Sequence, residues 1–502
     1  TAFLCNAALR DTEQRMAGLV YSTRIQPSAY VLARFIAALL VTWLAYLGTS
    51  VGFALGTLMP WLDQELLGPF VPGHYVYAVV VVGLPAIFAN AAIVYAIAVR
   101  TRDQRIAYAA IIALLVLYQV ASGALGQLEY RELAALVDPS GASAILDEIQ
   151  YWTIFERNSQ VVPVAGTLLY NRLLWLAIGL AMMALATLGF RFDQGDKRSA
   201  KPAAGQDGVQ PASANPAIAT FDPSQARFDR RTVRHQLLAS AAFEVRAVTR
   251  SVFFWVLLAL AVVNSVGSFF QLSAIFGTDL YPVTPALIQL MRGAATLSLM
   301  IIVVFYGAEL VWRDREHRFQ EILGATPTPN WVFLAGKIMA AVAVVFLFLL
   351  VCVLSAVLFQ LFNGFLRIEP MVYLGWFIYD YGMTFAFVVV LSVVVQALSP
   401  NKYVGMLLMV MVVLAMITLP GAGWEDPLYL FGQSNPVRYS AMNGYGGLLG
   451  AATWYVLYWA CFALILCLLG YLAWNRGLTE PLAIRLRRLS ANSTPATRTL
   501  LA

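Results

Sequence analysis

The densest cluster of charged side chains lies between Arg313 and Arg318, where the sequence reads RDREHR. It holds three arginines, two acids and one histidine, and long apolar segments lie on both sides of it. Such groups could form ion pairs with a partner protein, or they could anchor a helix end to lipid phosphates. The three histidines are too far apart in the sequence to suggest a zinc site, and no HExxH motif occurs.

A second copy of this block begins at Arg10. An ungapped alignment of 10–34 with 313–337 places Arg10, Asp11, Glu13 and Arg15 opposite Arg313, Asp314, Glu316 and Arg318. Apolar positions also agree, because Met16 falls on Phe319 and Leu19 falls on Ile322. Lipid anchoring alone would not require acids and arginines in the same register twice, so the repeat favours a specific role.

The apolar residues of both copies recur with the spacing of one helical face. Pro327 and Pro329 would end the helix in the second copy, as Pro27 would in the first. We therefore predict short amphipathic helices over 10–24 and 313–326, each able to dock into a groove of a partner.

These helices must be positioned by a membrane-embedded scaffold. The 502-residue chain is 60% hydrophobic and only 12% charged, whereas soluble domains are about 25% charged. The apolar runs are long enough for helices to cross a bilayer, and the alternating pattern of membrane barrels is absent. The predicted fold is all-α, with about ten spans at 30–59, 76–99, 104–125, 166–190, 252–273, 283–312, 331–362, 371–397, 402–420 and 448–474.

Basic residues alternate between the two sides of this arrangement. The basic segments are 10–27, 100–106, 191–251, 313–330, 399–402 and 475–502, and the segments between them carry few basic residues. The positive-inside rule places the basic set in the cytoplasm. The net charge of +6 is thus a sign of topology, and we expect membrane lipid rather than nucleic acid around the chain.

The sequence divides into two halves with the same orientation. We predict a first half at 1–190, a flexible linker rich in Ala, Pro, Gly and Ser at 191–230, a second half at 231–480 and a tail at 481–502. Residues 231–250 have the pattern of an interfacial helix, although an ordinary extension of the next span would also fit. The first half has fewer spans before its charged block, so we expect an interfacial helix, one span and most of another to precede Thr1.

The sequence resembles the type-2 ABC transporter permeases, in particular the long tandem kind whose relatives can carry a C-terminal zinc aminopeptidase domain. The resemblance covers nearly the whole chain. It is carried by GAELVWRDREHRFQEILGATPTPNWVFLAGK, by its weaker copy ALRDTEQRM, and by DPSG at 138–141, YWTIFERNSQ at 151–160, YNRLLW at 170–175 and PVRYSAMNGYGG at 436–447.

The resemblance implies two six-helix halves, the first incomplete, in a bacterial inner-membrane exporter. The helices at 10–24 and 313–326 would be coupling helices that contact two ATPase subunits, and 126–165 and 421–447 would be external helices. No GxxxxGK[ST] loop occurs, so ATP and Mg would be bound by the partner. The cargo would be hydrophobic, amphipathic or peptide-like, and a peptidase would be a further domain or subunit. On this hypothesis, reversing the charges of Glu316 and Arg318 lowers transport-linked ATPase activity.

Three charged residues lie within or near the ends of spans, namely Arg292, Glu309 and Asp380. Charge inside a membrane is costly and often functional, so a proton-coupled carrier that uses Asp380 is an alternative. The ungapped alignment puts Tyr77 opposite Asp380, which argues against a repeated proton site. An intramembrane enzyme is a further alternative, but no nucleophile motif, paired acids or histidine within a span supports it.

Overall fold

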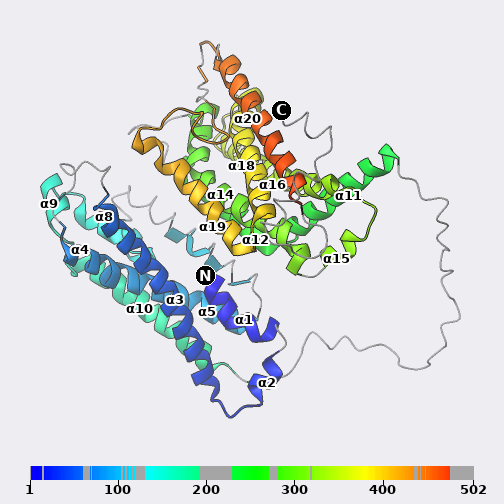
Figure 1. Cartoon of the computed structure of the whole chain (residues 1–502). Coiled ribbons are helices and arrows are strands. Elements are labelled where there is room, and N and C mark those ends of the chain that lie inside the picture. Colours follow the sequence, from blue (N-terminus) through cyan, green and yellow to red (C-terminus); the bar gives the residue numbers. More distant parts are fainter. Residues whose placement is uncertain are drawn as a thin grey trace. The chain divides into compact units, whose positions relative to one another are not determined.

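The computed structural model of the chain consists of helices and connecting segments (Figure 1). The residues it describes are 2–13, 16–59, 68, 70–102, 106–107, 110–111, 113–115, 117–118, 131–190, 192, 229–270, 281–316, 319–434, 439–440, 442–446 and 448–474. Two compact units divide the chain, Thr1–Arg227 and Phe228–Ala502. The boundary falls inside the predicted linker, whose residues 193–228 lie outside the described part.

The first unit contains α1 (Ala2–Glu13), α2 (Ala17–Tyr21), α3 (Pro27–Gly56), α4 (Pro72–Tyr77), η2 (Ala78–Gly83), α5 (Leu84–Thr101), α7 (Arg131–Val137), α8 (Ala142–Ile149), α9 (Ile154–Ser159) and α10 (Gly166–Leu188). The second unit contains α11 (Arg230–Thr249), α12 (Val252–Phe270), α14 (Thr284–Glu316), α15 (Phe319–Gly324), α16 (Asn330–Phe362), α17 (Pro370–Val372), η5 (Tyr373–Tyr381), α18 (Gly382–Leu398), α19 (Lys402–Thr418), η6 (Pro420–Ala422) and α20 (Leu448–Leu472).

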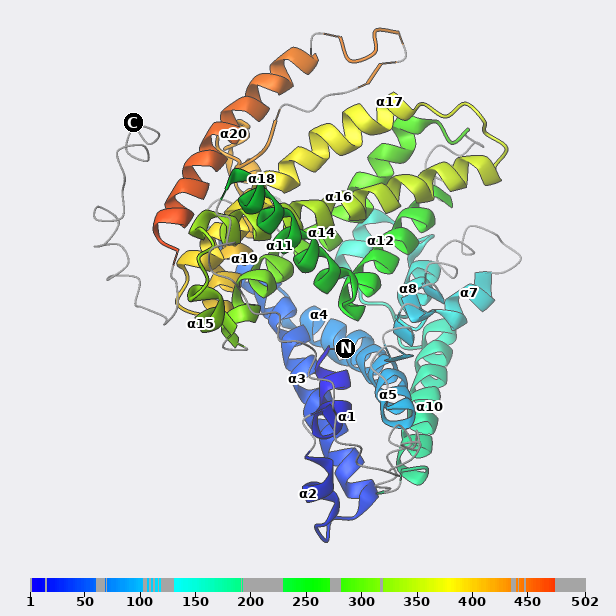
Figure 2. The same cartoon turned by 90° about the vertical axis from the view of Figure 1, so that its right-hand side faces the viewer.

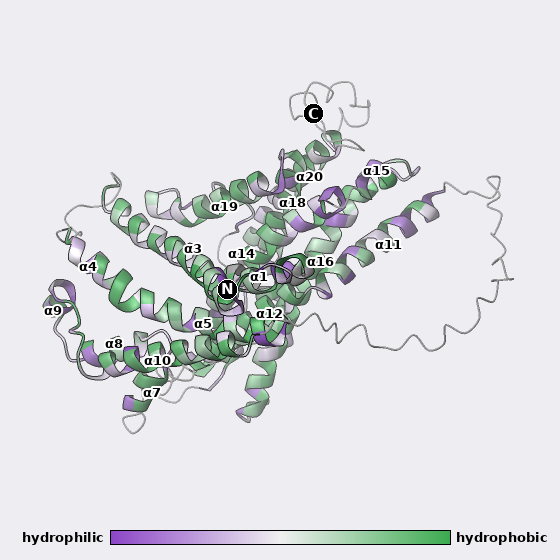
Figure 3. Cartoon of the chain, turned by 90° about the horizontal axis from the view of Figure 1, so that it is seen from below, coloured by the Kyte–Doolittle hydropathy of each residue, from purple (hydrophilic) through white to green (hydrophobic). Residues whose placement is uncertain are grey.

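The predicted all-α membrane fold is confirmed, and every regular element among the described residues is helical. Eight helices there are long and apolar enough to cross a membrane, and each coincides with a predicted span. They are Pro27–Gly56, Pro72–Thr101, Gly166–Leu188, Val252–Phe270, Thr284–Glu316, Asn330–Phe362, Pro370–Leu398 and Leu449–Leu472. The predicted span 402–420 is the shorter helix α19, and 104–125 lies largely outside the described residues. Figure 3 shows apolar residues dominating these helices and hydrophilic residues on α11 and α15.

The second unit has its core where α12, α14, α16 and α18 pack together. Its fully buried side chains include Phe254, Met291, Leu299, Phe348 and Phe385. The predicted interfacial helix is α11, which begins with Asp229 as its cap and packs along α16. Because α16 starts just after α15 and finishes just before α17, these two short helices mark opposite ends of the unit (Figure 2).

A π-helical segment interrupts the span that follows the long helix in each unit. Pro72 begins one such span and Pro370 the other, and η2 and η5 follow within a few residues. When the two prolines are aligned, Val82 rather than Tyr77 falls opposite Asp380. The ungapped sequence alignment was wrong here, because the connection before Pro72 is longer than the one before Pro370.

Two predicted helical segments differ in the structure. Residues Arg313 to Glu316 form the last turn of α14, and only Phe319–Gly324 make a separate short helix. The first unit divides in the same way between α1 and α2. The predicted external helix region 126–165 holds α7, α8 and α9, whereas the described part of 421–447 holds the end of the short helix η6, turns and an isolated bridge between Ser440 and Gly444.

Candidate functional site

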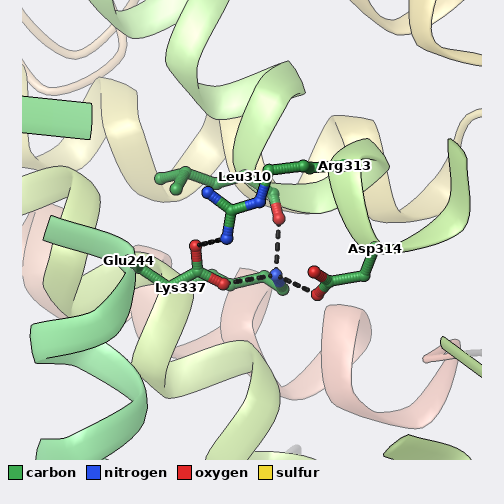
Figure 4. Close-up of polar contacts among 5 residues, drawn as sticks. All are labelled: Glu244, Leu310, Arg313, Asp314 and Lys337. Carbon is green, nitrogen blue, oxygen red and sulfur yellow. Dashed lines mark hydrogen bonds and ion pairs between the residues drawn. The ribbon is translucent and has the colours of Figure 1, made fainter. Parts of the chain in front are cut away.

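A buried lysine organises the end of the second unit that carries α15. Lys337 lies in α16, is 3% exposed, and points between α11 and α14 (Figure 4). Its ammonium donates to Glu244 Oε1 at 2.8 Å, to Asp314 Oδ2 at 2.7 Å and to the carbonyl of Leu310 at 2.5 Å. All three ammonium donors are therefore used.

Arg313 completes this cluster by pairing with the other carboxylate oxygen of Glu244. The cluster thus contains two acids and two bases, which balances the charge that burial would otherwise make very costly. Glu244 comes from α11, Arg313 and Asp314 from α14, and Lys337 from α16. We call these four residues the Lys337 cluster.

Glycine allows the helices of the Lys337 cluster to approach closely. A Cβ atom at Gly336 would lie 2.9 Å from the Ser240 hydroxyl of α11. A side chain there would require Ser240 to shift, so Gly336 marks a close approach of α16 to α11. Glu244 lies on the same helical stripe as the buried residues Ala241 and Val248, so its carboxylate is directed inward.

The first unit repeats the central part of this geometry. Arg34 occupies the position aligned with Lys337 and donates to Asp11 Oδ2 at 2.5 Å and to the carbonyl of Ala7 at 3.0 Å. Asp11 is aligned with Asp314, and Ala7 precedes its block by the same number of residues as Leu310. The repeat inferred from the sequence is therefore also a repeat of contacts. Tyr30 adds a hydrogen bond to Asp11 at 2.8 Å.

Lys402, the first residue of α19, binds the same end of α14 from another side. It donates to Glu309 at 2.6 Å and lies 3.4 Å from a Glu316 carboxylate oxygen. The indole of Trp312 also donates to the buried Gln396 of α18 at 3.0 Å. The last turns of α14 are consequently fixed to α11, α16, α18 and α19 at once.

These contacts involve several of the predicted coupling residues. Arg313, Asp314, Glu316 and Asp11 all bond within the chain, so their charges are not wholly available to a partner. Arg10 is exposed. Arg15 and Arg318 lie outside the described residues, and so does the side chain of Glu13. Contact of any of them with an ATPase stays a prediction.

Apolar side chains are exposed at matching positions of the two short helices. Phe319 and Ile322 of α15 are 49% and 63% exposed, and Met16 and Leu19 beside and within α2 are 46% and 66% exposed. The next apolar position is partly buried in both units, at Val20 and Leu323. Each short helix is therefore partly covered by its own unit and leaves two apolar residues exposed. We call Met16 with Leu19, and Phe319 with Ile322, the apolar pairs.

The three predicted intramembrane charges all have partners. Glu309 bonds Lys402 as described, and Arg292 forms an ion pair with Asp380. Ser434 donates to the other oxygen of Asp380 at 2.8 Å. Asp380 is thus held between Arg292 and Ser434.

Sequence reasoning missed Glu244, Lys337, Lys402 and Arg34. One signal was present, because Glu244 is an acid on the apolar stripe of α11 and a buried acid requires a basic partner. Nothing local in the sequence indicates which base that partner is. The described residues contain no group of three or more His, Cys, Asp or Glu side chains able to hold a metal.

Comparison of the chain with protein-family models, with curated proteins and with solved structures finds no match.

Proposed function

We propose that this chain is the membrane-spanning subunit of an ATP-driven transporter, and that α2 and α15 dock onto separate ATPase subunits. The observation that carries the proposal is the repetition of the apolar pairs. Exposed apolar residues at the same two positions of two short helices suit a pair of equivalent partners.

The rigid attachment of α14 supports the same function. A push on α15 would reach α11, α16, α18 and α19 together, because the Lys337 cluster, Lys402 and the hydrogen bond from Trp312 to Gln396 join α14 to them all. Nucleotide state in the partner and the arrangement of the spans would then bias one another. ATP and Mg belong on the partner, since the sequence has no phosphate-binding loop.

The remaining features of the proposal follow from the sequence. The basic segments favour a cytoplasmic location for α2, α15 and the linker, and the resemblance to tandem type-2 permeases implies a bacterial inner membrane. Export of a hydrophobic, amphipathic or peptide-like cargo fits the resemblance to tandem type-2 permeases. An associated aminopeptidase is part of the same resemblance.

The apolar pairs offer a cleaner test than the charged residues. Reversal of Glu316 would also break its contact with Lys402, so a loss of activity would have two explanations. The variant Phe319→Ser with Ile322→Ser removes apolar surface of which about half or more is exposed, and it breaks no ion pair among the described residues. Phe362→Ser is the matched control, because Phe362 is 88% exposed at the opposite end of α16.

We expect the Phe319 and Ile322 double variant to be inserted normally but to lose most of its co-purifying ATPase subunit and of its transport-linked ATP hydrolysis. The Phe362 control should keep both. Retention of a full complement of ATPase by the double variant would refute docking through α15.

A further inference from the structure

An ion pair joins two spans at the α17 end of the second unit, far from the Lys337 cluster. Arg292 lies in α14 eight residues after its start at Thr284, and Asp380 lies ten residues after Pro370. Among the described residues of this unit, the other ion pairs all involve the α15 end. Arg292 and Asp380 therefore form a separate charged tie.

Neighbouring side chains reinforce this tie. The ring of Tyr381 lies 5.3 Å from the Arg292 guanidinium carbon, and its hydroxyl is 2.6 Å from that of Thr296. Asp380 and Tyr381, two successive residues of η5, thus both contact the turn of α14 that carries Arg292 and Thr296. A tie made only for stability could have been apolar, since a buried ion pair seldom exceeds apolar packing in stability.

The tie also holds the connection between α19 and α20. Ser434 in this connection donates to Asp380 Oδ1, and the adjacent Gln433 carbonyl accepts from the indole of Trp459 at 2.8 Å. The Tyr445 hydroxyl donates to the carbonyl of Val372 in α17. Asp380 is therefore the point where α14, η5 and this connection meet.

Asp380 and Tyr381 are the last two residues of the π-helical segment η5. π-Helical turns are rare in proteins overall, and those that occur often lie at functional sites. When such a segment moves along a helix, each residue that it passes turns by about 100°, which is the rotation of one helical position. Movement of η5 toward α18 would therefore turn Asp380 away from Arg292 and Tyr381 away from Thr296 in one step.

The first unit contains a related arrangement built from different residues. Arg172 of α10 is 4% exposed and donates to the carbonyl of Val82 at 3.1 Å, at the position that the prolines align with Asp380. Its guanidinium also lies against Gly141, where a Cβ atom would come within 1.2 Å of Nη2. In both units an arginine thus binds the end of a π-helical segment, and the connection before the last span lies against Asp380 in the second unit and against the arginine itself in the first.

We propose that Arg292, Asp380 and Ser434 form a latch that holds the α17 end of the second unit closed, and that η5 is the segment that moves when the latch opens. Opening exposes the interior of the unit to the side of the membrane opposite α15. The latch rests on contacts within the second unit and does not require that an ATPase bind α15.

Cys352 provides a native reporter of this opening. It lies in α16 beside Tyr381 and is completely buried. In the full chain with Cys5, Cys461 and Cys467 replaced by serine, a membrane-impermeant maleimide would be applied to each side of the membrane in turn. The rate of Cys352 labelling then measures how often the latch opens, and the side of labelling reports the direction.

We expect Arg292→Gln and Asp380→Asn each to raise the labelling rate at least tenfold from the α17 side only. The exchanged pair Arg292→Asp with Asp380→Arg should return the rate to within about threefold of the native one. Phe362→Ser, which changes an exposed side chain at the same end of the unit, should leave it unchanged. Native rates in both single variants, or an equal rise from both sides, would overturn the proposal.

Hydrogen exchange gives a second readout that does not depend on the thiol. In Arg292→Gln, amides of 373–384 and 430–434 should exchange faster, while those of α11 and the first half of α16 should not change. Uniformly faster exchange would indicate general unfolding and would also count against a latch. Unchanged exchange in 373–384 would show that η5 is not the moving part.

Discussion

Lys337 illustrates how one residue can determine a local arrangement. Its removal leaves two carboxylates, Glu244 and Asp314, without their shared base. Breaking a buried ion pair by removing one partner costs about 3–5 kcal/mol. Removing an acid together with the lysine costs less, because a smaller uncompensated charge remains.

We therefore predict that Lys337→Met lowers the melting temperature of the detergent-purified protein strongly, and that adding Glu244→Gln recovers part of the loss. A double-mutant cycle with these two changes should show a coupling of about 1–3 kcal/mol. Strictly additive effects would mean that the two side chains do not interact in the folded protein.

Asp11 supplies a residue-scale prediction for pH. Burial raises the pKa of Asp11, but hydrogen bonds from Arg34 and Tyr30 and the nearby arginine charges outweigh it, so its pKa is lowered from 3.8. A lowered pKa means that the contact stabilises the folded unit above the unfolded pKa and is lost as pH falls through the folded one.

We expect the melting temperature of the native chain to fall more steeply below about pH 4 than that of Asp11→Asn, which should be less stable at pH 7. Thermal melts across this pH range would measure the difference. Parallel pH profiles for the two proteins would contradict the role given to Asp11.

At the scale of elements, the sequence predicted the spans well because apolar runs of this length have few other structures available in a membrane. It predicted the short helices less well. The charged turn from Arg313 to Glu316 continues α14 because Glu244, Lys337 and Lys402 bind it from other elements. Such long-range partners leave no periodic pattern near the turn itself, so a local reading placed the helix boundary too early.

The long helices α3 and α16 are equivalent but are covered to different extents. Residues 33, 37, 41, 45, 49 and 53 of α3 are all exposed, whereas the aligned residues 336, 340, 344, 348, 352 and 356 of α16 are all buried. The elements packed on α16 that lack a described counterpart in the first unit are α11, α12 and the beginning of α14. The exposed stripe is Ala, Ala, Val, Ala, Thr and Phe, and small residues at every fourth position favour helix packing in membranes.

We predict that a further helix covers this stripe in the assembled membrane protein. Spin labels at Ala37 and Ala45 should be poorly accessible to dissolved oxygen, and labels at Leu40 and Val51 should be highly accessible. The last two positions are matched controls, because Ala343 and Leu354 are also exposed on α16. Equal accessibility at all four sites would show that lipid covers the stripe.

At the scale of the whole molecule, the chain consists of two related units, each with a fixed end and a pair of exposed apolar residues. Composition and the repeat predicted this organisation, since both depend on many residues together. The latch at Asp380 was not predictable from the repeat, because the first unit achieves a similar tie with Arg172 and a backbone carbonyl. Its partners, Arg292 and Ser434, are distant in the sequence and are brought together only by helix packing.

The proposed transport function depends on what contacts the apolar pairs. A photo-crosslinking amino acid placed at Leu19 or at Ile322 would capture that contact in native membranes, with Phe362 as the control position. We predict that both sites, and not the control, crosslink to one ATP-binding protein and that the yield changes when ATP is added. Crosslinks to lipid alone, or to a protein that does not bind ATP, would contradict it.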